Sequence, residues 1–152
     1  PGIVDMRVFV GEPGYEYKEN FRTLSEAALS GGVTSVVTMP NTNPIIDNVS
    51  IVELLQRKAR KESHVKIFST GSITKKLEGN ELSEFGLLSE AGAVAFTDAT
   101  TAVNNASVIH NAWSLVPIRK EPLDFLYILP ASPRKESLGI LDDRNLIFLF
   151  PK

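Results

Sequence analysis

The sequence predicts an α/β fold with a parallel sheet built from about four βα units. Between Ile3 and Ala112, short apolar runs alternate with amphipathic stretches, a pattern typical of parallel strands that are each followed by a helix. The run from Thr34 to Met39 is uncharged and rich in β-branched residues, as expected for a strand covered on both faces. Of the 152 residues, 43% are hydrophobic and 22% charged, which indicates one soluble globular domain.

The first βα unit has clear boundaries. A strand is expected from Ile3 to Phe9, because the sequence Glu-Pro-Gly at 12–14 interrupts it. A helix is expected near Asn20 to Ser30, where apolar residues recur at helical spacing. The glycines at 31–32 then end this helix. After the second strand, the prolines in 40–44 predict a loop.

The second helix is expected to begin at a capping box formed by Ser50 to Glu53. Its buried stripe is expected to contain Ile51, Leu54 and Leu55. The basic run from Arg57 to Lys61 is expected to be its solvated face.

Two further units follow. A third strand is expected from Val65 to Ser69, and a fourth from Ala93 to Thr97. Between them, Asn80 is expected to cap a third helix, whose inner face would be Leu82, Phe85 and Leu88. A fourth helical segment is expected from Asn104 to Trp113.

The pattern changes after residue 112. Five of the nine prolines fall in 113–152, and no clear period of two or 3.6 survives there. The apolar runs 124–129 and 146–150 leave two interpretations open, a buried strand or a segment never selected to fold. We therefore divide the chain into a domain at 1–112 and a divergent tail at 113–152, for which an out-of-frame origin and disorder both remain open.

Composition and charge exclude several classes of protein. Sixteen basic and eighteen acidic residues are interspersed, with a net charge of -2, so no nucleic-acid partner is expected. Cysteine is absent, which excludes disulfides and thiolate metal sites. No signal peptide and no apolar run of about 18 residues is present, so we expect no membrane partner and a cytoplasmic location. Because Pro1 is not an initiator residue, we expect the chain to begin inside a longer product or to follow processing.

Four segments in order resemble the motifs of one enzyme family. Residues 1–14 resemble the pattern PGxxDxHxHxREPG of dihydroorotases and related cyclic amidohydrolases. Residues 31–44 are similar to GGxTxxxxMPNTxP, residues 70–75 to TGxITK, and residues 90–98 to EAGxxAFTDDG. Together they cover residues 1–112 in the expected order and spacing. On these motifs the chain is identified as a member of the dihydroorotase family.

The resemblance implies a fold and a reaction. The fold is a partial TIM (β/α)₈ barrel of the amidohydrolase type, since the whole barrel typically needs about 250 residues and this chain matches only its first half. The family reaction is the zinc-dependent, reversible hydrolysis of the cyclic amide of dihydroorotate to carbamoyl aspartate in pyrimidine biosynthesis. Zinc in such enzymes polarises a carbonyl group and generates hydroxide near neutral pH.

The same resemblance shows that the metal ligands are replaced. Arg7 and Phe9 stand where the family has two zinc-binding histidines, and Gly11 stands where it has a substrate-binding arginine. A guanidinium stays protonated and repels a cation, and a phenyl ring has no lone pair to donate. Zinc sites use at least three protein ligands. We therefore expect this chain not to bind the family's zinc, and we assign no catalytic residue.

Two family positions are retained. By the resemblance, Asn41 matches an asparagine that holds the substrate carboxylate, and Asp98 matches the first of two paired carboxylates, the second being replaced by Ala99. A metal-ligand role for Asp98 is the weaker hypothesis, and a cap on the following turn is favoured. His64 and His110 are expected to be structural.

Three functional hypotheses remain open. The first is an active cyclic amidohydrolase, which would require a noncanonical metal site or ligands supplied by another chain. The second is a pseudoenzyme, either a homo-oligomer or a structural partner of aspartate carbamoyltransferase. The third is a truncated product without function. The second and third are favoured, because an open sheet of four strands leaves two edges that only a partner or the tail can cover.

Overall fold

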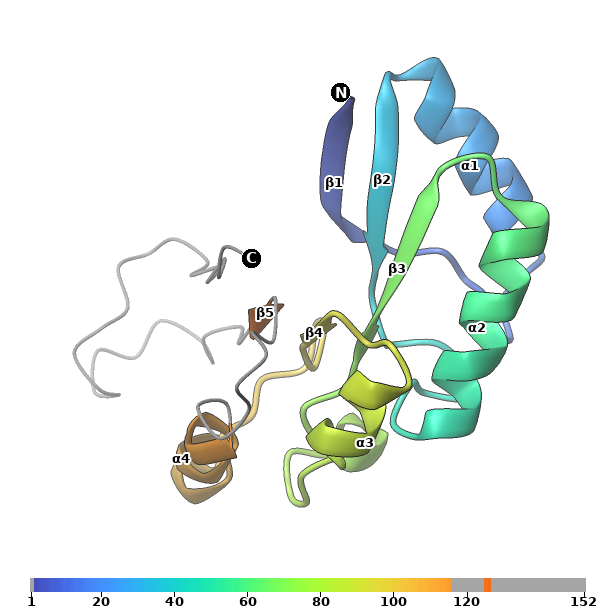
Figure 1. The fold of residues 1–152 in the computed structure, drawn as a ribbon. Coiled ribbons are helices and arrows are strands. Elements are labelled where there is room, and N and C mark those ends of the chain that lie inside the picture. The colour runs from blue at the N-terminus through green and yellow to red at the C-terminus, as the bar shows by residue number, and fades with distance from the viewer. Residues whose placement is uncertain (1, 116–124, 127–152) are drawn as a thin grey trace.

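The computed structural model describes residues 2–115 and 125–126. Strands and helices alternate along these residues (Figure 1). The elements are β1 (Ile3–Val8), α1 (Phe21–Ser30), β2 (Val33–Thr38), α2 (Val49–Glu62), β3 (Lys66–Gly71), the 3₁₀ helix η1 (Lys75–Leu77), α3 (Phe85–Glu90), β4 (Ala95–Phe96), α4 (Ala106–Leu115) and β5 (Phe125–Leu126).

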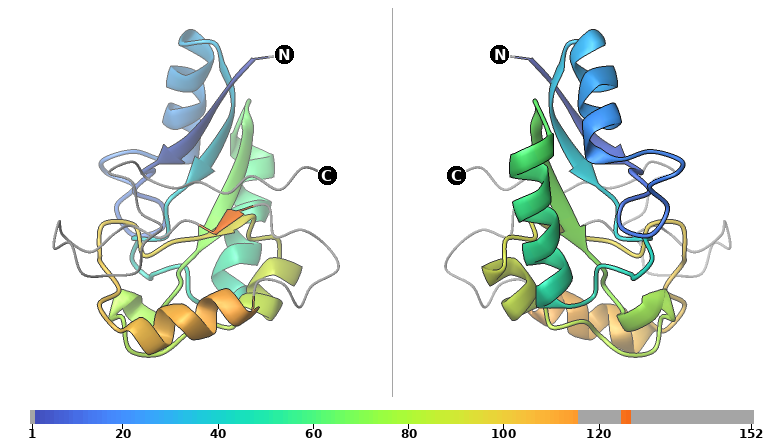
Figure 2. Two further views of the ribbon diagram at one scale, coloured as in Figure 1. Left: turned by 90° about the vertical axis from the view of Figure 1, so that its left-hand side faces the viewer. Right: turned by 90° about the vertical axis from the view of Figure 1, so that its right-hand side faces the viewer.

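The strands form one sheet in the order β1-β2-β3-β4-β5, and each neighbouring pair is parallel. Helices α1 and α2 lie on the same face of this sheet (Figures 1 and 2). Strand order that follows chain order, with the crossover helices on one side, is the arrangement of the first units of a (β/α)₈ barrel. The predicted parallel α/β fold is confirmed.

Helix α1 begins where the sequence predicts. The Asn20 side chain accepts a hydrogen bond from the Thr23 backbone N–H (3.0 Å), and the Thr23 hydroxyl accepts one from the Asn20 N–H (3.1 Å). This reciprocal capping satisfies two backbone donors at the helix start. The helix ends at Gly31, whose N–H donates to the carbonyl oxygens of Ala27 and Ala28.

Helix α2 differs from the prediction in its cap. The N-cap is Asn48, whose side chain accepts from the Ile51 N–H (3.2 Å), so the capping box at Ser50 to Glu53 is wrong. The physical reason is that Asn48 keeps extended backbone angles while the helix already begins at Val49. An asparagine at this position caps as well as a serine does.

The buried face of α2 is also rotated from the prediction. It contains Ile51, Val52, Leu55 and Ala59, whereas Leu54 is 48% exposed. Ala59 therefore interrupts the basic run that was expected to be fully solvated. Residues 51, 55 and 59 lie on one face of the helix because positions four apart are one turn above each other.

The third unit contains a loop excursion that the sequence did not indicate. Asn80 is exposed and does not cap α3, which begins at Phe85. Residues 73–83 form a closed loop instead. Two backbone hydrogen bonds join its ends, from the Ser83 N–H to the Ile73 oxygen (2.9 Å) and from the Lys75 N–H to the Glu81 oxygen (2.8 Å). These bonds use the backbone groups that a longer helix would need, so α3 is short.

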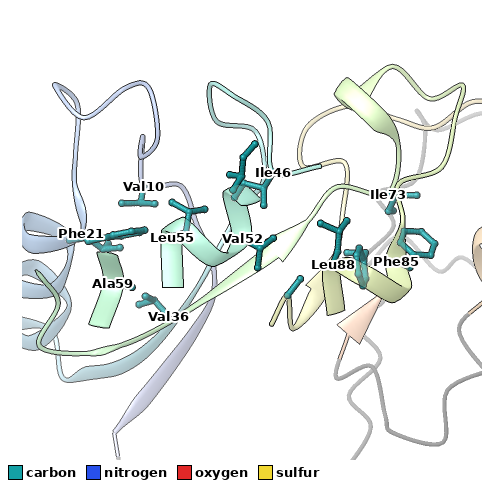
Figure 3. Close-up of a cluster of buried hydrophobic side chains, with 14 of the residues drawn as sticks. Val10, Phe21, Val36, Ile46, Val52, Leu55, Ala59, Ile73, Phe85 and Leu88 are labelled. Atoms are coloured by element: carbon teal, nitrogen blue, oxygen red, sulfur yellow. The ribbon is translucent and has the colours of Figure 1, made fainter. Parts of the chain in front are cut away.

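The hydrophobic core lies between the sheet and its helices (Figure 3). One part gathers Val36 of β2 with Phe21 of α1 and Leu55 of α2. The other gathers residues of α3 and β4, where the rings of Phe85 and Phe96 have centroids 4.5 Å apart. Burial of this apolar surface is the main favourable term in folding, and it fixes the ends of the strands from which the candidate site is built.

The two edges of the sheet differ. Strand β5 pairs with β4 through Ala95↔Phe125 and Phe96↔Leu126, so part of the tail covers one edge. The apolar run 146–150 lies outside the described residues. At the other edge, β1 pairs only with β2 among the residues described. No helix in the described part of the chain is long and apolar enough to cross a membrane.

Candidate functional site

The candidate site lies at the carboxyl ends of the parallel strands, where α/β barrels place their functional residues. Backbone hydrogen bonds join the loops that leave these ends. The Asn43 N–H donates to the Pro13 oxygen (3.0 Å), which links the loops after β2 and β1. The Ser72 N–H donates to the Ile46 oxygen (2.9 Å), which links the loops after β3 and β2. The loops after β1, β2 and β3 are therefore joined by hydrogen bonds at this end of the sheet.

Arg7 and Phe9, where the motif comparison predicts the family's two histidines, lie at the end of β1. Arg7 is exposed, and its backbone N–H donates to the Asp5 carboxylate (3.1 Å). Phe9 is 40% exposed, and its ring centroid lies 6.5 Å from that of Tyr15. The Phe9 ring therefore packs as an ordinary aromatic side chain against the loop that follows its own strand.

Aromatic residues of this loop form a group that was not predicted. The rings of Tyr15 and Tyr17 are 6.4 Å apart, and the Lys18 ammonium lies 5.1 Å from the Tyr15 centroid. A cation over an aromatic face is attracted by the quadrupole of the ring. The close spacing of Phe9, Tyr15 and Tyr17 in the sequence could have indicated this group.

Gly11 occupies a position with no room for a side chain. An added Cβ atom would lie 2.6 Å from the backbone oxygen of Tyr15. The loop closes there because the Tyr15 N–H donates to the Gly11 oxygen (2.5 Å). Gly11, where the motif comparison predicts an arginine, therefore lies directly beneath the backbone of Tyr15.

Glu12 has a structural role that the sequence analysis missed. It is 1% exposed, forms an ion pair with Lys58 of α2, and accepts a hydrogen bond from the Phe21 N–H (2.9 Å) at the start of α1. A buried carboxylate needs such partners to offset its loss of hydration. The hydrogen bond to Glu12 raises the pKa of Lys58. The prediction that Lys58 belongs to a purely solvated face is wrong, because its ammonium reaches this carboxylate.

Asp98 is held by the loop after β3. It is 3% exposed, and one carboxylate oxygen accepts from the N–H groups of Ile73 (2.8 Å) and Thr74 (2.9 Å). The other oxygen accepts from the Thr74 hydroxyl (2.5 Å). The prediction that the Asp98 side chain caps the following turn is wrong. That turn is closed by a hydrogen bond from the Thr101 N–H to the backbone oxygen of Asp98 (2.8 Å). The side chain instead joins β4 to its neighbour.

The environment of Asp98 predicts a pH dependence. Burial raises the pKa of the Asp98 carboxyl, and hydrogen bonds from Thr74 and Ile73 offset part of the rise. The folded protein therefore holds this proton more tightly than the unfolded chain. The contribution to stability is complete below about pH 4 and is lost as the pH rises through the raised folded-state pKa.

We expect Asp98→Asn, which cannot titrate, to gain stability relative to the wild type as the pH rises through this range. Urea unfolding of both proteins at a series of pH values measures the difference. A difference that is constant with pH, or that changes in the opposite direction, would contradict the assignment.

Asn41 follows β2 and has an unused hydrogen-bonding atom. The residue is half-buried, and its side-chain oxygen is buried with no hydrogen-bond partner among the described residues. The adjacent loop is held by the Thr42 hydroxyl, which donates to the Pro44 oxygen (2.8 Å). A buried acceptor without a donor is costly, so the Asn41 side chain is a family-matched position with an unmet hydrogen bond among the described residues.

The described residues do not fit a zinc ion. No group of three histidine, cysteine, aspartate or glutamate side chains that could hold a metal occurs among residues 2–115 and 125–126. His64 is exposed between α2 and β3, and His110 is exposed on α4. The oxygens of Asp98 already accept hydrogen bonds from protein donors.

A family model and individual relatives point to the same family. A family model described as Dihydro-orotase-like matches residues 1–117. The dihydroorotase of Ruminiclostridium cellulolyticum is 44% identical over 112 residues, which are 74% of this chain and 26% of that protein. The dihydroorotase of Aquifex aeolicus is 42% identical over 115 residues, or 76% and 27% of the two chains.

A solved structure agrees with the fold. The L-hydantoinase (dihydropyrimidinase) from Arthrobacter aurescens matches with a TM-score of 0.54 and 26% identity, over 64% of this chain and 21% of that one. The parallel strands and their helices therefore define a chain of the amidohydrolase class that carries the first units of the barrel. Within this class, the chain belongs to the dihydroorotase-like family. It spans about a quarter of the length of the curated relatives that it matches.

Proposed function

We propose that this chain is a catalytically inactive member of the dihydroorotase-like family. The observation that carries the proposal is the set of side chains at the family's metal position. Arg7 and Phe9 stand there, and neither side chain can donate an electron pair to zinc. The family reaction, hydrolysis of dihydroorotate to carbamoyl aspartate, depends on that metal.

The surroundings of Asp98 support the same proposal. A carboxylate that ligates zinc directs a lone pair at the metal. Here both oxygens accept from Ile73 and Thr74 instead. This contact with the loop after β3 accounts for the buried position of Asp98 without a metal.

We also expect the chain to bind the family's substrate more weakly than the family's enzymes do, because a second family residue is replaced. Asn41 keeps the family's asparagine, and its side-chain oxygen is buried without a hydrogen-bond partner among the described residues. Its partner in the family motif is an arginine, and Gly11 stands in that place. Without the guanidinium, a carboxylate loses the bidentate, charge-assisted contact that fixes its orientation.

A cytoplasmic location is part of the proposal, and the absence of cysteine from the sequence favours a reducing compartment. A non-catalytic role beside aspartate carbamoyltransferase is the alternative. Co-sedimentation of the two purified proteins tests this alternative, and separate migration at every concentration would reject it.

The test of inactivity is a dihydroorotate hydrolysis assay with zinc supplied. The dihydroorotase of Ruminiclostridium cellulolyticum, measured in parallel, shows that the assay works. We expect the present chain to give no turnover above the rate without enzyme. Turnover that increases in proportion to the protein and stops when a chelator is added would refute the proposal.

A further inference from the structure

The outer face of helix α2 carries a group of cations. Arg57, Arg60 and Lys61 are all exposed on this helix, and positions three and four apart lie on one face of a helix. The three side chains therefore form a basic stripe, here called the α2 stripe, on the side opposite the buried residues of the helix. Leu54, one turn before the stripe, is 48% exposed.

The α2 stripe lacks carboxylate partners among the described residues. Elsewhere an exposed cation such as Arg22 is paired within the chain, with Glu26 at 3.3 Å. In the part of the chain that the structure describes, Arg57 and Lys61 form no ion pair. Arg60 contacts only an uncharged amide oxygen one turn before it, at 3.5 Å. The stripe therefore presents three positive charges to its surroundings.

The stability of the helix does not account for the whole stripe. Basic side chains in the last turn of a helix interact favourably with its dipole, and this explains Arg60 and Lys61, which lie in that turn. Arg57 lies before the last turn, and the exposed Leu54 gains nothing from the dipole. Protein interfaces are enriched in arginine and combine apolar with charged side chains, so the composition of this face fits a contact surface.

The position of α2 in the fold keeps this face clear of other barrel units. In a (β/α)₈ barrel the helices form an outer ring, in which each helix packs beside those of the preceding and following units. Both neighbours of α2 are described, because α2 contacts α1 and α3, and Figure 2 shows these helices around the sheet. Further units continue the ring beyond them, so they do not cover the outer face of α2.

We propose that the α2 stripe is a docking surface for an acidic helix of a partner protein. The three cations recur at helical spacing, so a helix with carboxylates three and four positions apart can present one to each of them. A guanidinium binds a carboxylate through two parallel hydrogen bonds, and Leu54 adds an apolar contact beside the charges. The proposal does not depend on whether the chain is catalytically active.

The charges favour a protein helix over a nucleic acid or an anionic membrane. Glu53 is exposed one turn before Arg57, and its carboxylate repels a continuous row of phosphates. A partner helix avoids this repulsion with a lysine or an uncharged residue opposite Glu53. The net charge of -2 on the whole chain also opposes attraction to an extended anionic surface.

The first test uses two synthetic peptides as probes. One is a fluorescently labelled helical peptide with glutamates three and four positions apart beside a leucine, and the other has lysines in place of the glutamates. Fluorescence anisotropy is expected to show that the wild-type chain binds the glutamate peptide, and more weakly as salt is added. Arg57→Glu/Lys61→Glu is expected to weaken this binding at least about tenfold and to bind the lysine peptide instead.

Two controls separate the proposed contact from net charge. Arg22→Glu/Lys76→Glu makes the same change in net charge at exposed positions outside α2, and we expect it to bind the glutamate peptide within about twofold of the wild type. Leu54→Ser is expected to weaken binding about fivefold, because it removes a half-exposed apolar contact, and to leave the salt dependence unchanged. Circular dichroism checks that each variant is folded.

Three results would overturn the proposal. One is a wild-type chain that does not bind the glutamate peptide at low salt. Another is an equal loss of binding in the α2 double variant and in Arg22→Glu/Lys76→Glu, which would mean that only net charge matters. The third is equal affinity of the wild type for a thymidine oligonucleotide or for phosphatidylserine vesicles, which would show a general attraction to anions instead of a protein docking surface.

Discussion

Asp98→Ala is expected to lower the free energy of unfolding by about 3 kcal/mol at pH 7. The substitution leaves the N–H groups of Ile73 and Thr74 and the Thr74 hydroxyl without their acceptor. Each buried polar group left unpaired costs about 1–3 kcal/mol, less whatever water can recover. Urea unfolding followed by circular dichroism measures the loss.

Asp98→Asn is the matched control, because its amide oxygen can still accept from both N–H groups. We expect it to cost less than about 1 kcal/mol. Equal losses for the alanine and asparagine variants would mean that these hydrogen bonds do not stabilise the fold. Asp98 would then be free for another role, including a metal contact.

Lys58→Met is expected to cost about 3 kcal/mol at pH 7. The methionine keeps most of the apolar stem but leaves Glu12, which is 1% exposed, without its ion-pair partner. Removing one member of a buried pair typically costs about 3–5 kcal/mol. We take the lower limit because the Lys58 side chain is 36% exposed and water can approach the pair.

Two further variants identify the cause. Lys61→Met, on the exposed part of the same helix, should change the free energy of unfolding by less than about 0.5 kcal/mol. Glu12→Gln added to Lys58→Met should recover part of the loss, because the amide oxygen can still accept from the Phe21 N–H. A Lys58→Met loss no larger than that of Lys61→Met would contradict the account of Glu12.

Glu12 and Asp98 stabilise two of the family-like motifs through contacts within the fold. In this chain both belong to the family-like motifs, and both make contacts within the fold. Glu12 joins the loop after β1 to α1 and α2, and Asp98 joins β4 to the loop after β3. These contacts involve only groups of the chain itself, so both residues have a structural role that requires no metal.

The regular elements could be predicted from sequence because their signals are local. The strand at 3–8 and the helix at 21–30 were predicted from hydrophobic spacing along short stretches of sequence. The prediction failed where two local signals competed, as at Asn48 and Ser50. There the choice depends on which residue keeps extended backbone angles, and propensity alone does not decide it.

The site was harder to predict because its contacts are not local. Nothing in the spacing of Glu12 and Lys58 indicates that the two side chains meet, since the contact requires α2 to pack beside the loop after β1. The exclusion of a side chain at Gly11 likewise depends on the path of the backbone at Tyr15. Asn41 and Asp98 were located through motifs, but the partners of Asp98 came only from the fold.

The central claim is that Arg7 and Phe9 leave the family's metal position without ligands. The most direct test is to incubate the purified chain with excess zinc, remove the unbound metal by dialysis, and measure zinc per chain by mass spectrometry. We predict far less than one zinc ion per chain, and the same value for Asp98→Asn. One zinc ion or more per chain in the wild type, reduced by Asp98→Asn, would contradict the account.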